Sequence, residues 1–354
     1  MQFEIPLPVR FGHERTFGHI RSTAAQLANT CTLRPCPDFV LKRKLFGRTF
    51  YMHGKVTISH LQQMKREGQK SVGLVAWDYQ IARIADRAGF DFISVGDSVG
   101  VNLWGRSDVL DVTLEEMLIC CKAVRRGTTR ALLSCDMPYG PVQHGGDAAL
   151  AAAHRLMREG GADLIKIDAA AEFPQVVRAL VDAGIPVFAQ FGLTPQTASK
   201  YGIPYSAQNS PAAQASAEAA ARLVEEAKLL EAAGACLLDF TNSGPIAGAA
   251  VAAAVKIPVI GGFGGGPWLD GRVRLAHTAI GYGDKWLDAT TETYANTARA
   301  ALDAFAALIA DARASRQNQR LTKQKPATAA CQPLGRNFRH YWRLFDQSRR
   351  DEHV

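Results

Sequence analysis

Short apolar segments alternate with helix-like segments along most of this 354-residue chain, and this alternation limits the folds that the chain can adopt. Beginning at Lys55, eight strand-like runs recur at a spacing of roughly 25–30 residues, which is typical of successive β-α units. Strands of a parallel sheet that is covered on both faces are apolar along their whole length. The pattern therefore predicts an α/β fold, and eight repeats favour a (β/α)8 TIM barrel over an open, doubly wound sheet.

The expected elements can be placed from these runs and from the residues that begin and end helices. Strands are predicted over residues 72–77, 92–97, 132–136, 164–168, 187–191, 236–241, 259–263 and, more weakly, 279–281. Helices are predicted over residues 57–68, 78–89, 113–126, 148–160, 173–183, 212–233, 246–255 and 288–314. Asp78 is a favourable N-cap, Gly89 is a favourable helix stop, and Thr113 and Glu116 have the spacing of a capping box. Residues 194–211 predict a loop long enough to be a lid.

Basic residues gather near the two ends of the chain. Of the formal net charge of +8, residues 1–55 carry +6 and residues 313–354 carry +7, which leaves −5 for the remainder. We therefore expect an N-terminal extension over residues 1–54, a catalytic barrel domain over residues 55–314 and a basic C-terminal tail over residues 315–354. No nucleic-acid-binding motif accompanies these basic segments, so we expect solvated or subunit-facing ends and no nucleic-acid partner.

The chain has the composition of a cytoplasmic enzyme. No stretch of ~18 uncharged apolar residues is present, and residues 1–21 lack the apolar core of a signal peptide. Neither a membrane span nor secretion is therefore expected. The seven cysteines are odd in number and fit no zinc-binding spacing, which favours a reducing, cytoplasmic location.

Carboxylates stand at the carboxyl ends of three successive expected strands. They are Asp97, Asp136 and Asp168, and Lys166 lies two residues before the last of them. Because the functional groups of a (β/α)8 barrel lie at the carboxyl ends of its strands, we expect these side chains to lie close together. Three carboxylates from neighbouring strand ends predict a hard divalent cation held by oxygen ligands.

Several ordered motifs, together with these strands, resemble the ketopantoate hydroxymethyltransferase (3-methyl-2-oxobutanoate hydroxymethyltransferase) family. The resemblance covers roughly residues 55–290 and includes residues 95–100, 123–127, 132–138, 164–167, 192–196 and 230–235. It implies a (β/α)8 barrel that assembles as a homodecamer. It also implies Mg²⁺ as cofactor, and the addition of a hydroxymethyl group from 5,10-methylenetetrahydrofolate to an α-keto acid such as 3-methyl-2-oxobutanoate.

The resemblance carries over to four positions of this chain. Asp97 and Asp136 match the carboxylates that bind the metal, and Ser98 and Lys166 match groups that hold the substrate carboxylate. Mg²⁺ keeps few protein ligands and leaves positions for substrate oxygens. A 2-keto acid bound to it has a polarised carbonyl group, which acidifies the neighbouring C–H bond.

The chain departs from the family at three strand ends. Asp168 replaces a Glu near the metal, Gln190 replaces a His, and Thr241 replaces the Glu that acts as general base. A neutral hydroxyl cannot take the C3 proton of a keto acid. Asp239 lies on the same strand face as Thr241, about 6–7 Å deeper in the barrel. It is the candidate base in a different substrate pose, and a buried structural acid is the alternative.

Two other functions stay open at this point. The replacement by Thr241 is compatible with a diverged paralogue that carries out different C–C bond chemistry on another 2-oxo acid. A catalytically inactive, metal-binding or scaffolding paralogue, whose basic ends recruit a partner, is the third possibility. Lys166 likewise has two interpretations, a substrate ligand or a structural ion pair with Asp168 along one strand face.

Overall fold

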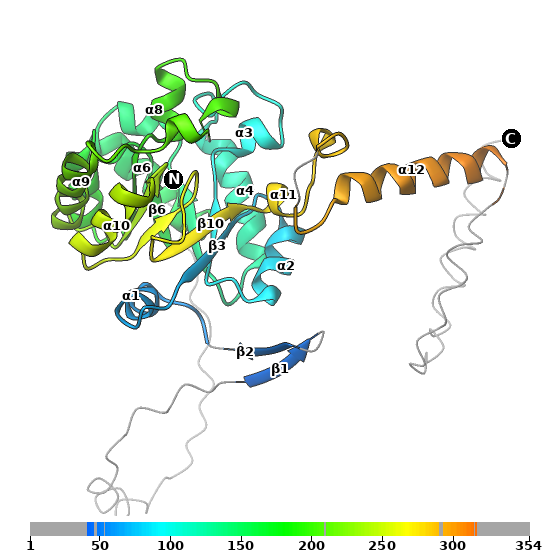
Figure 1. The fold of residues 1–354 in the computed structure, drawn as a ribbon, viewed down its shortest axis with the longest axis horizontal. Helices are drawn as coiled ribbons and strands as arrows, with labels where there is room; N and C mark the ends of the chain where they lie inside the picture. Colours follow the sequence, from blue (N-terminus) through cyan, green and yellow to red (C-terminus); the bar gives the residue numbers. More distant parts are fainter. Residues whose placement is uncertain are drawn as a thin grey trace, which may run out of the picture. The chain divides into compact units, whose positions relative to one another are not determined.

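The computed structural model describes residues 41–45, 48–52, 54–208, 210–289, 293–314 and 316. Most of the expected N-terminal extension and nearly all of the basic C-terminal tail lie outside these residues. The described chain divides after Leu275 into two compact units (Figure 1). Among the described helices, none is long and apolar enough to cross a membrane.

The first unit contains a closed barrel of eight parallel strands, which confirms the predicted (β/α)8 fold. The strands follow one another around the barrel in the order β10-β3-β4-β5-β6-β7-β8-β9. Their bounds are Ser71–Val75 (β3), Phe92–Val95 (β4), Leu132–Asp136 (β5), Leu164–Ile167 (β6), Val187–Gly192 (β7), Leu237–Thr241 (β8), Val259–Gly261 (β9) and Gly271–Leu275 (β10). Five of them, β4, β5, β6, β8 and β9, are buried along their whole length, as expected for a sheet that is covered on both faces.

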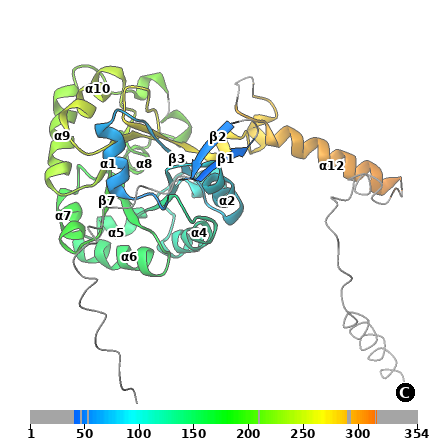
Figure 2. The ribbon, with the colours of Figure 1, turned by 90° about the horizontal axis from the view of Figure 1, so that it is seen from below.

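Helices form a ring around these strands (Figure 2). The ring helices are α2 (Tyr79–Ala88), α4 (Leu114–Gly127), α6 (Gly146–Arg158), α7 (Pro174–Asp182), α9 (Ala220–Ala232) and α10 (Pro245–Ala254). Shorter elements follow individual strands: α3 (Val99–Asn102), α5 (Tyr139–Gln143), α8 (Pro195–Lys200), η1 (Tyr205–Ala207) and η2 (Pro211–Ala213). Helix α1 (Ile58–Arg66) lies at the barrel end opposite to α3 and α8 (Figures 1 and 2). Before it, β1 (Leu41–Leu45) and β2 (Arg48–Met52) pair antiparallel.

Two helix boundaries are set by the capping residues that the sequence predicts. The Asp78 side chain accepts hydrogen bonds from the backbone N–H groups of Gln80 and Ile81, and Gly89 ends the same helix at a φ of 98°. The left-handed conformation at this position favours glycine, which has no Cβ to clash. Helix α4 begins with a complete capping box between Thr113 and Glu116.

Four predicted elements in the carboxyl half of the chain are wrong in position or length. The helix expected over residues 288–314 begins only at Thr297, where Asn296 caps it. The eighth strand is β10 and not residues 279–281, which lie at the end of a short helix and in the turn after it. Strand β10 has exposed Arg272 and Arg274 on either side of buried Val273, so it lacks the apolar run used to find the others. Helix α9 begins at Ala220 and not at residue 212, because the preceding segment forms hydrogen bonds to the end of β8. The expected loop over residues 194–211 contains α8 and η1.

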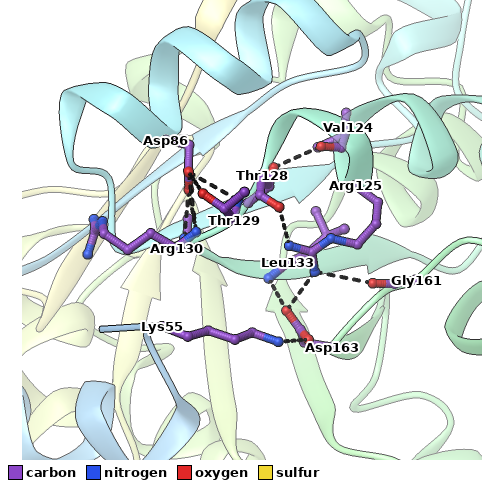
Figure 3. Close-up of polar contacts among 11 residues, drawn as sticks. Lys55, Asp86, Val124, Arg125, Thr128, Thr129, Arg130, Leu133, Gly161 and Asp163 are labelled. Carbon is purple, nitrogen blue, oxygen red and sulfur yellow. Dashed lines mark hydrogen bonds and ion pairs between the residues drawn. The ribbon is translucent and has the colours of Figure 1, made fainter. Parts of the chain in front are cut away.

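Two buried or half-buried aspartates hold the amino-terminal end of β5 in place (Figure 3). Asp86 on α2 accepts hydrogen bonds from the backbone N–H groups of Thr129, Arg130 and Ala131, at 2.8–3.2 Å, and from the Thr129 hydroxyl at 2.7 Å. Asp163 accepts the backbone N–H of Leu133 at 2.9 Å and forms ion pairs with Arg125 and Lys55. These contacts orient the strand whose other end carries Asp136.

The second unit contains α11 (Ala276–Ala279), η3 (Asp284–Trp286) and α12 (Thr297–Arg313). Asn296 caps α12 by accepting the backbone N–H of Arg299 at 2.9 Å. No residue of this 17-residue helix is buried in the described chain. Its exposed apolar residues fall on one side of the helix at helical spacing; they are Leu302, Phe305, Leu308 and Ile309.

Candidate active site

The barrel brings all of the predicted site residues to the carboxyl ends of five neighbouring strands, β4 to β8. Each of these side chains is buried: Asp97, Ser98, Asp136, Lys166, Asp168, Gln190, Asp239 and Thr241. Strand pairing places Asp136 opposite Lys166, and Gln190 opposite Asp239. A cluster that is dispersed over 145 positions of sequence, from 97 to 241, is therefore compact in the fold.

Three carboxylates of the cluster repel one another in a buried setting. Burial, followed by the charges of Asp136 and Asp168, holds the pKa of Asp97 well above its usual range. Burial also raises the pKa of Asp136, partly offset by Lys166. Burial raises the pKa of Asp168 to about 7, against hydrogen bonds from Thr194 and Gln196. Ionised carboxylates in this arrangement are stabilised by a bound cation.

Gln196 connects two of these carboxylates. Its side-chain Nε2 donates to Asp97 Oδ2 at 2.8 Å and to the Met137 carbonyl oxygen at 3.3 Å, and its backbone N–H donates to Asp168 Oδ2 at 3.3 Å. Gln196 lies in the first turn of α8, whose N-cap is Thr194. Gln196 lies within one of the motifs that carry the family resemblance, residues 192–196, but it is not among the predicted site residues.

Two serines lie beneath Asp136 and were also missed. The Ser94 hydroxyl donates to Asp136 Oδ1 at 3.3 Å and lies 3.1 Å from the Ser134 hydroxyl. Both serines are buried in strand positions, where they interrupt otherwise apolar runs. A polar residue inside a buried strand is the sequence signal that identifies them.

Lys166 is held between two carboxylates. Its Nζ lies 2.8 Å from Asp239 Oδ2 and 3.9 Å from Asp136 Oδ2. Burial acts to lower the pKa of Lys166, but the charges of Asp136 and Asp239 outweigh it, so this pKa is raised and the ammonium keeps its proton. Asp239 Oδ1 accepts the backbone N–H of Gly262 at 3.0 Å. Both oxygens of Asp239 are therefore engaged.

Two of the three strand-end positions expected to depart from the family motif contact each other. Gln190 Nε2 lies 3.0 Å from Thr241 Oγ1, and both side chains are buried. Neither of these two side chains ionises in the physiological pH range. This edge of the site therefore offers hydrogen-bonding groups but no acid or base.

Comparison with known proteins places the chain in a family. The family model described as ketopantoate hydroxymethyltransferase matches residues 55–317, well over half of the chain. The chain belongs to this family. The 3-methyl-2-oxobutanoate hydroxymethyltransferase of Heliobacterium modesticaldum is 35% identical over 73% of this chain and 93% of its own length. The protein of that name from Geobacillus sp. (strain WCH70) is 37% identical over 70% of this chain and 87% of its own length.

Among solved structures, phosphonopyruvate hydrolase superposes on 77% of this chain and 92% of its own length, with a TM-score of 0.48 and 15% identity.

The match to the family model confirms the resemblance that the motifs indicate, and the relatives of this chain are named as transferases. In this ketopantoate hydroxymethyltransferase family member, Asp168, Gln190 and Thr241 occupy the three positions at which the resemblance led us to expect Glu, His and Glu.

The residues of this family member fit a hard divalent cation with few protein ligands. Within the ranges that the structure describes, no group of three or more His, Cys, Asp or Glu side chains has the arrangement of a metal site. Asp97 and Asp136 nevertheless bring two carboxylates together, as a Mg²⁺ ion that keeps several waters requires. Asp168 Oδ1, next to them, is buried without a hydrogen-bond partner in the described chain. Such an oxygen is satisfied by an ion or its waters.

Proposed function

We propose that this chain transfers a hydroxymethyl group to a 2-oxo acid such as 3-methyl-2-oxobutanoate, in the presence of Mg²⁺. The observation that carries the proposal is the charge of the buried site. Asp97, Asp136, Asp168 and Asp239 face Lys166, which is the only buried Lys or Arg side chain among those described. An excess of buried carboxylates is stable with a divalent cation, and carboxylate oxygens with few protein ligands suit a hard ion such as Mg²⁺.

The chain's own residues have distinct roles in this proposal. Asp97 and Asp136 hold the cation, and Asp168 supports it from the adjacent strand end. When bound there, the cation would supply Lewis-acid polarisation of the 2-oxo group, which would acidify the neighbouring C–H bond. Ser98 and Lys166 bind the substrate carboxylate, and Gln190 contributes a hydrogen-bond donor at the opposite edge. The roles of Asp97, Asp136, Ser98 and Lys166 follow the family resemblance, whereas Asp168 and Gln190 are replacements that keep an oxygen ligand and a donor.

Proton transfer from C3 is assigned to Asp239. Asp239 is the carboxylate of β8, its Oδ2 lies 2.8 Å from Lys166 Nζ, and a carboxylate is a group that can act as a general base. Thr241 occupies the end of the same strand and borders the reacting carbon without taking the proton.

We further propose 5,10-methylenetetrahydrofolate as the donor of the hydroxymethyl group and a homo-oligomeric assembly, as the family resemblance implies. A reducing cytoplasm is the proposed location, since the four cysteines in the described chain are free thiols.

Exchange of the C3 proton tests this function without requiring the donor. We expect the C3–H signal of 3-methyl-2-oxobutanoate to disappear in deuterated water with protein and Mg²⁺, and to persist when Mg²⁺ is removed by a chelator. Addition of 5,10-methylenetetrahydrofolate then yields the hydroxymethylated product. A protein that binds Mg²⁺ and the keto acid but catalyses no exchange contradicts the proposal.

The contact between Gln190 and Thr241 favours a second candidate, different C–C bond chemistry on another 2-oxo acid. These two neutral groups hydrogen-bond to each other where the family motif has two titratable ones. A panel of 2-oxo acids in the same exchange experiment separates the candidates, because turnover of another acid alone supports the second one. Loss of all turnover with Mg²⁺ binding intact indicates a scaffolding protein instead.

A further inference from the structure

Tyr205 reaches the carboxyl end of β4 from a distant part of the chain. It is the first residue of η1, between α8 and α9, and its hydroxyl lies 3.2 Å from Asn102 Nδ2. Asn102 Nδ2 also donates to the Ser98 carbonyl oxygen at 2.9 Å, so Asn102 links the phenol to Ser98. The Tyr205 ring lies 5.4 Å from the Phe263 ring, centroid to centroid. The phenol is thus held beside the residue expected to bind the substrate carboxylate.

The segment that carries Tyr205 is fastened to the end of β8. Asn242 Nδ2 donates to the Gln208 carbonyl oxygen at 2.9 Å and to the Leu193 carbonyl oxygen at 3.3 Å. Asn242 has a φ of 52°, a left-handed conformation that asparagine tolerates better than most residues. Gln208 Nε2 in turn donates to the Ile203 carbonyl oxygen at 3.1 Å. Tyr205 lies between these attachment points, so its position is defined.

The Tyr205 hydroxyl is a neutral donor at physiological pH. Burial raises its pKa to about 12, with the nearby charge of Asp97 acting in the same direction. An amide nitrogen such as Asn102 Nδ2 can only donate, so this contact occupies a lone pair of the phenol oxygen and leaves its proton available. The proton is then directed toward Ser98 or toward a ligand oxygen beside it.

Within the described part of residues 194–211, no cationic side chain lies beside Ser98. Lys200 is the one basic residue in the described part of residues 194–211. Its Nζ lies 3.7 Å from Glu172 Oε2, and both side chains are exposed. Lys200 therefore interacts at the surface, and Tyr205 is the polar group that this segment brings to Ser98.

We propose that Tyr205 is a specificity-determining residue whose hydroxyl, together with Ser98, donates hydrogen bonds to the carboxylate of the 2-oxo acid. This inference rests on the proposed function, because it names a ligand of the same substrate. Two neutral donors and the paired ammonium of Lys166 bind a carboxylate at one edge of the site. A substrate that lacks this carboxylate leaves these donors unpaired and binds more weakly.

Replacement of the hydroxyl alone tests the inference. Tyr205→Phe keeps the ring against Phe263 and removes the donor. We expect the Kd and the KM for 3-methyl-2-oxobutanoate, measured with Mg²⁺ by calorimetry and steady-state kinetics, to rise about tenfold or more, because a hydrogen bond to a charged acceptor is lost. The kcat should change less than twofold. Tyr201→Phe is the matched control, since Tyr201 is 69% exposed and lies four residues away, and it should leave both constants unchanged.

Three results overturn the inference. An unchanged Kd and KM in Tyr205→Phe, with wild-type binding intact, refutes the role of the hydroxyl and leaves the proposed function standing. An equal rise in both tyrosine variants shows an effect of the segment and not of the hydroxyl. Failure of the wild-type protein to bind any 2-oxo acid refutes the proposed function first, and the role of Tyr205 with it.

Discussion

Lys166 and Asp239 form a buried ion pair across the barrel, with Nζ and Oδ2 separated by 2.8 Å. The two residues belong to β6 and β8, with β7 between them. The pair determines how much of the ammonium charge is available to a substrate. Lys166 is shared between Asp239 and Asp136, so an anionic ligand meets a partly neutralised cation.

Removal of one partner of this pair should be costly. Asp239→Leu leaves a buried ammonium with only the more distant Asp136, and we expect the free energy of unfolding to fall by about 3 kcal/mol. The double variant Asp239→Leu/Lys166→Met removes both charges and should recover part of this loss. Urea unfolding of the single and double variants measures both effects. A single variant as stable as the wild type contradicts a structural contribution of the pair.

Asp136 should be required for the cation. Asp136→Asn keeps the size of the side chain and removes one carboxylate, so Mg²⁺ binding measured by calorimetry should weaken at least tenfold and Mg²⁺-dependent turnover should be lost. Asp147→Asn, an exposed position on α6, is the control and should behave as the wild type. Full Mg²⁺-dependent turnover in Asp136→Asn rules out this ligand.

A carboxylate at position 241 should add a base to the site. Thr241→Glu introduces a group that can take a proton where Thr241 only hydrogen-bonds to Gln190. We expect deuterium exchange at C3 of 3-methyl-2-oxobutanoate to become at least tenfold faster, which is a modest gain for general base catalysis. Thr241→Gln has a similar size without the charge and should give no gain. Equal exchange rates in both variants would show that the base is not limiting.

Asp86 should make stability depend on pH in the acidic range. Burial opposes its ionisation, but hydrogen bonds from Ala131, Thr129 and Arg130 outweigh this, and the pKa of Asp86 is lowered from 3.8. A lowered folded-state pKa gives stability that is present above the unfolded pKa and is lost as the pH falls through the folded value. Asp86→Asn should therefore lower the free energy of unfolding by about 2 kcal/mol at pH 7.

The difference between Asp86→Asn and the wild type should then shrink as the pH falls below the unfolded pKa and through the lowered folded-state pKa, because the wild-type carboxylate then becomes protonated in both states. Asp182→Asn, at an exposed position on α7, is the control and should show no such pH dependence. Urea unfolding at pH 7 and at several acidic values measures the difference. If the free energies of unfolding of Asp86→Asn and the wild type differ by the same amount at every pH, the effect comes from the shape of the side chain and not from the charge of the carboxylate.

Helix α12 should contribute to self-association. Phe305 and Leu308 are 63% and 65% exposed in the described chain, on a helix that buries none of its residues. Exposed apolar stripes of this kind mark interfaces. The double variant Phe305→Ser/Leu308→Ser should lower the mass measured by sedimentation, whereas Asp303→Ser, on the other side of the helix, should not. A wild-type protein that sediments as a monomer contradicts the homo-oligomer.

Much of the fold was predictable because each signal is local. An apolar run between helices predicts a buried parallel strand wherever it occurs, and seven of the eight strands were found in this way. Strand β10 was missed since its alternation of buried and exposed residues resembles a strand with one solvent-facing side. The start of α9 was misplaced because an Ala-rich segment has high helix propensity, whereas hydrogen bonds to Asn242 and Gly244 hold its first residues outside the helix.

The sequence by itself determined the barrel, the strand ends and the residue types that gather there, since these depend on periodicity and on the position of each polar residue along its strand. Only the tertiary structure decided which of those residues touch. Lys166 pairs with Asp239 of another strand, Gln196 joins Asp97 to Asp168, and Tyr205 meets Asn102 across 103 positions of sequence. Such contacts depend on barrel closure and on side-chain direction, and neither is encoded in the neighbours of a residue along the chain.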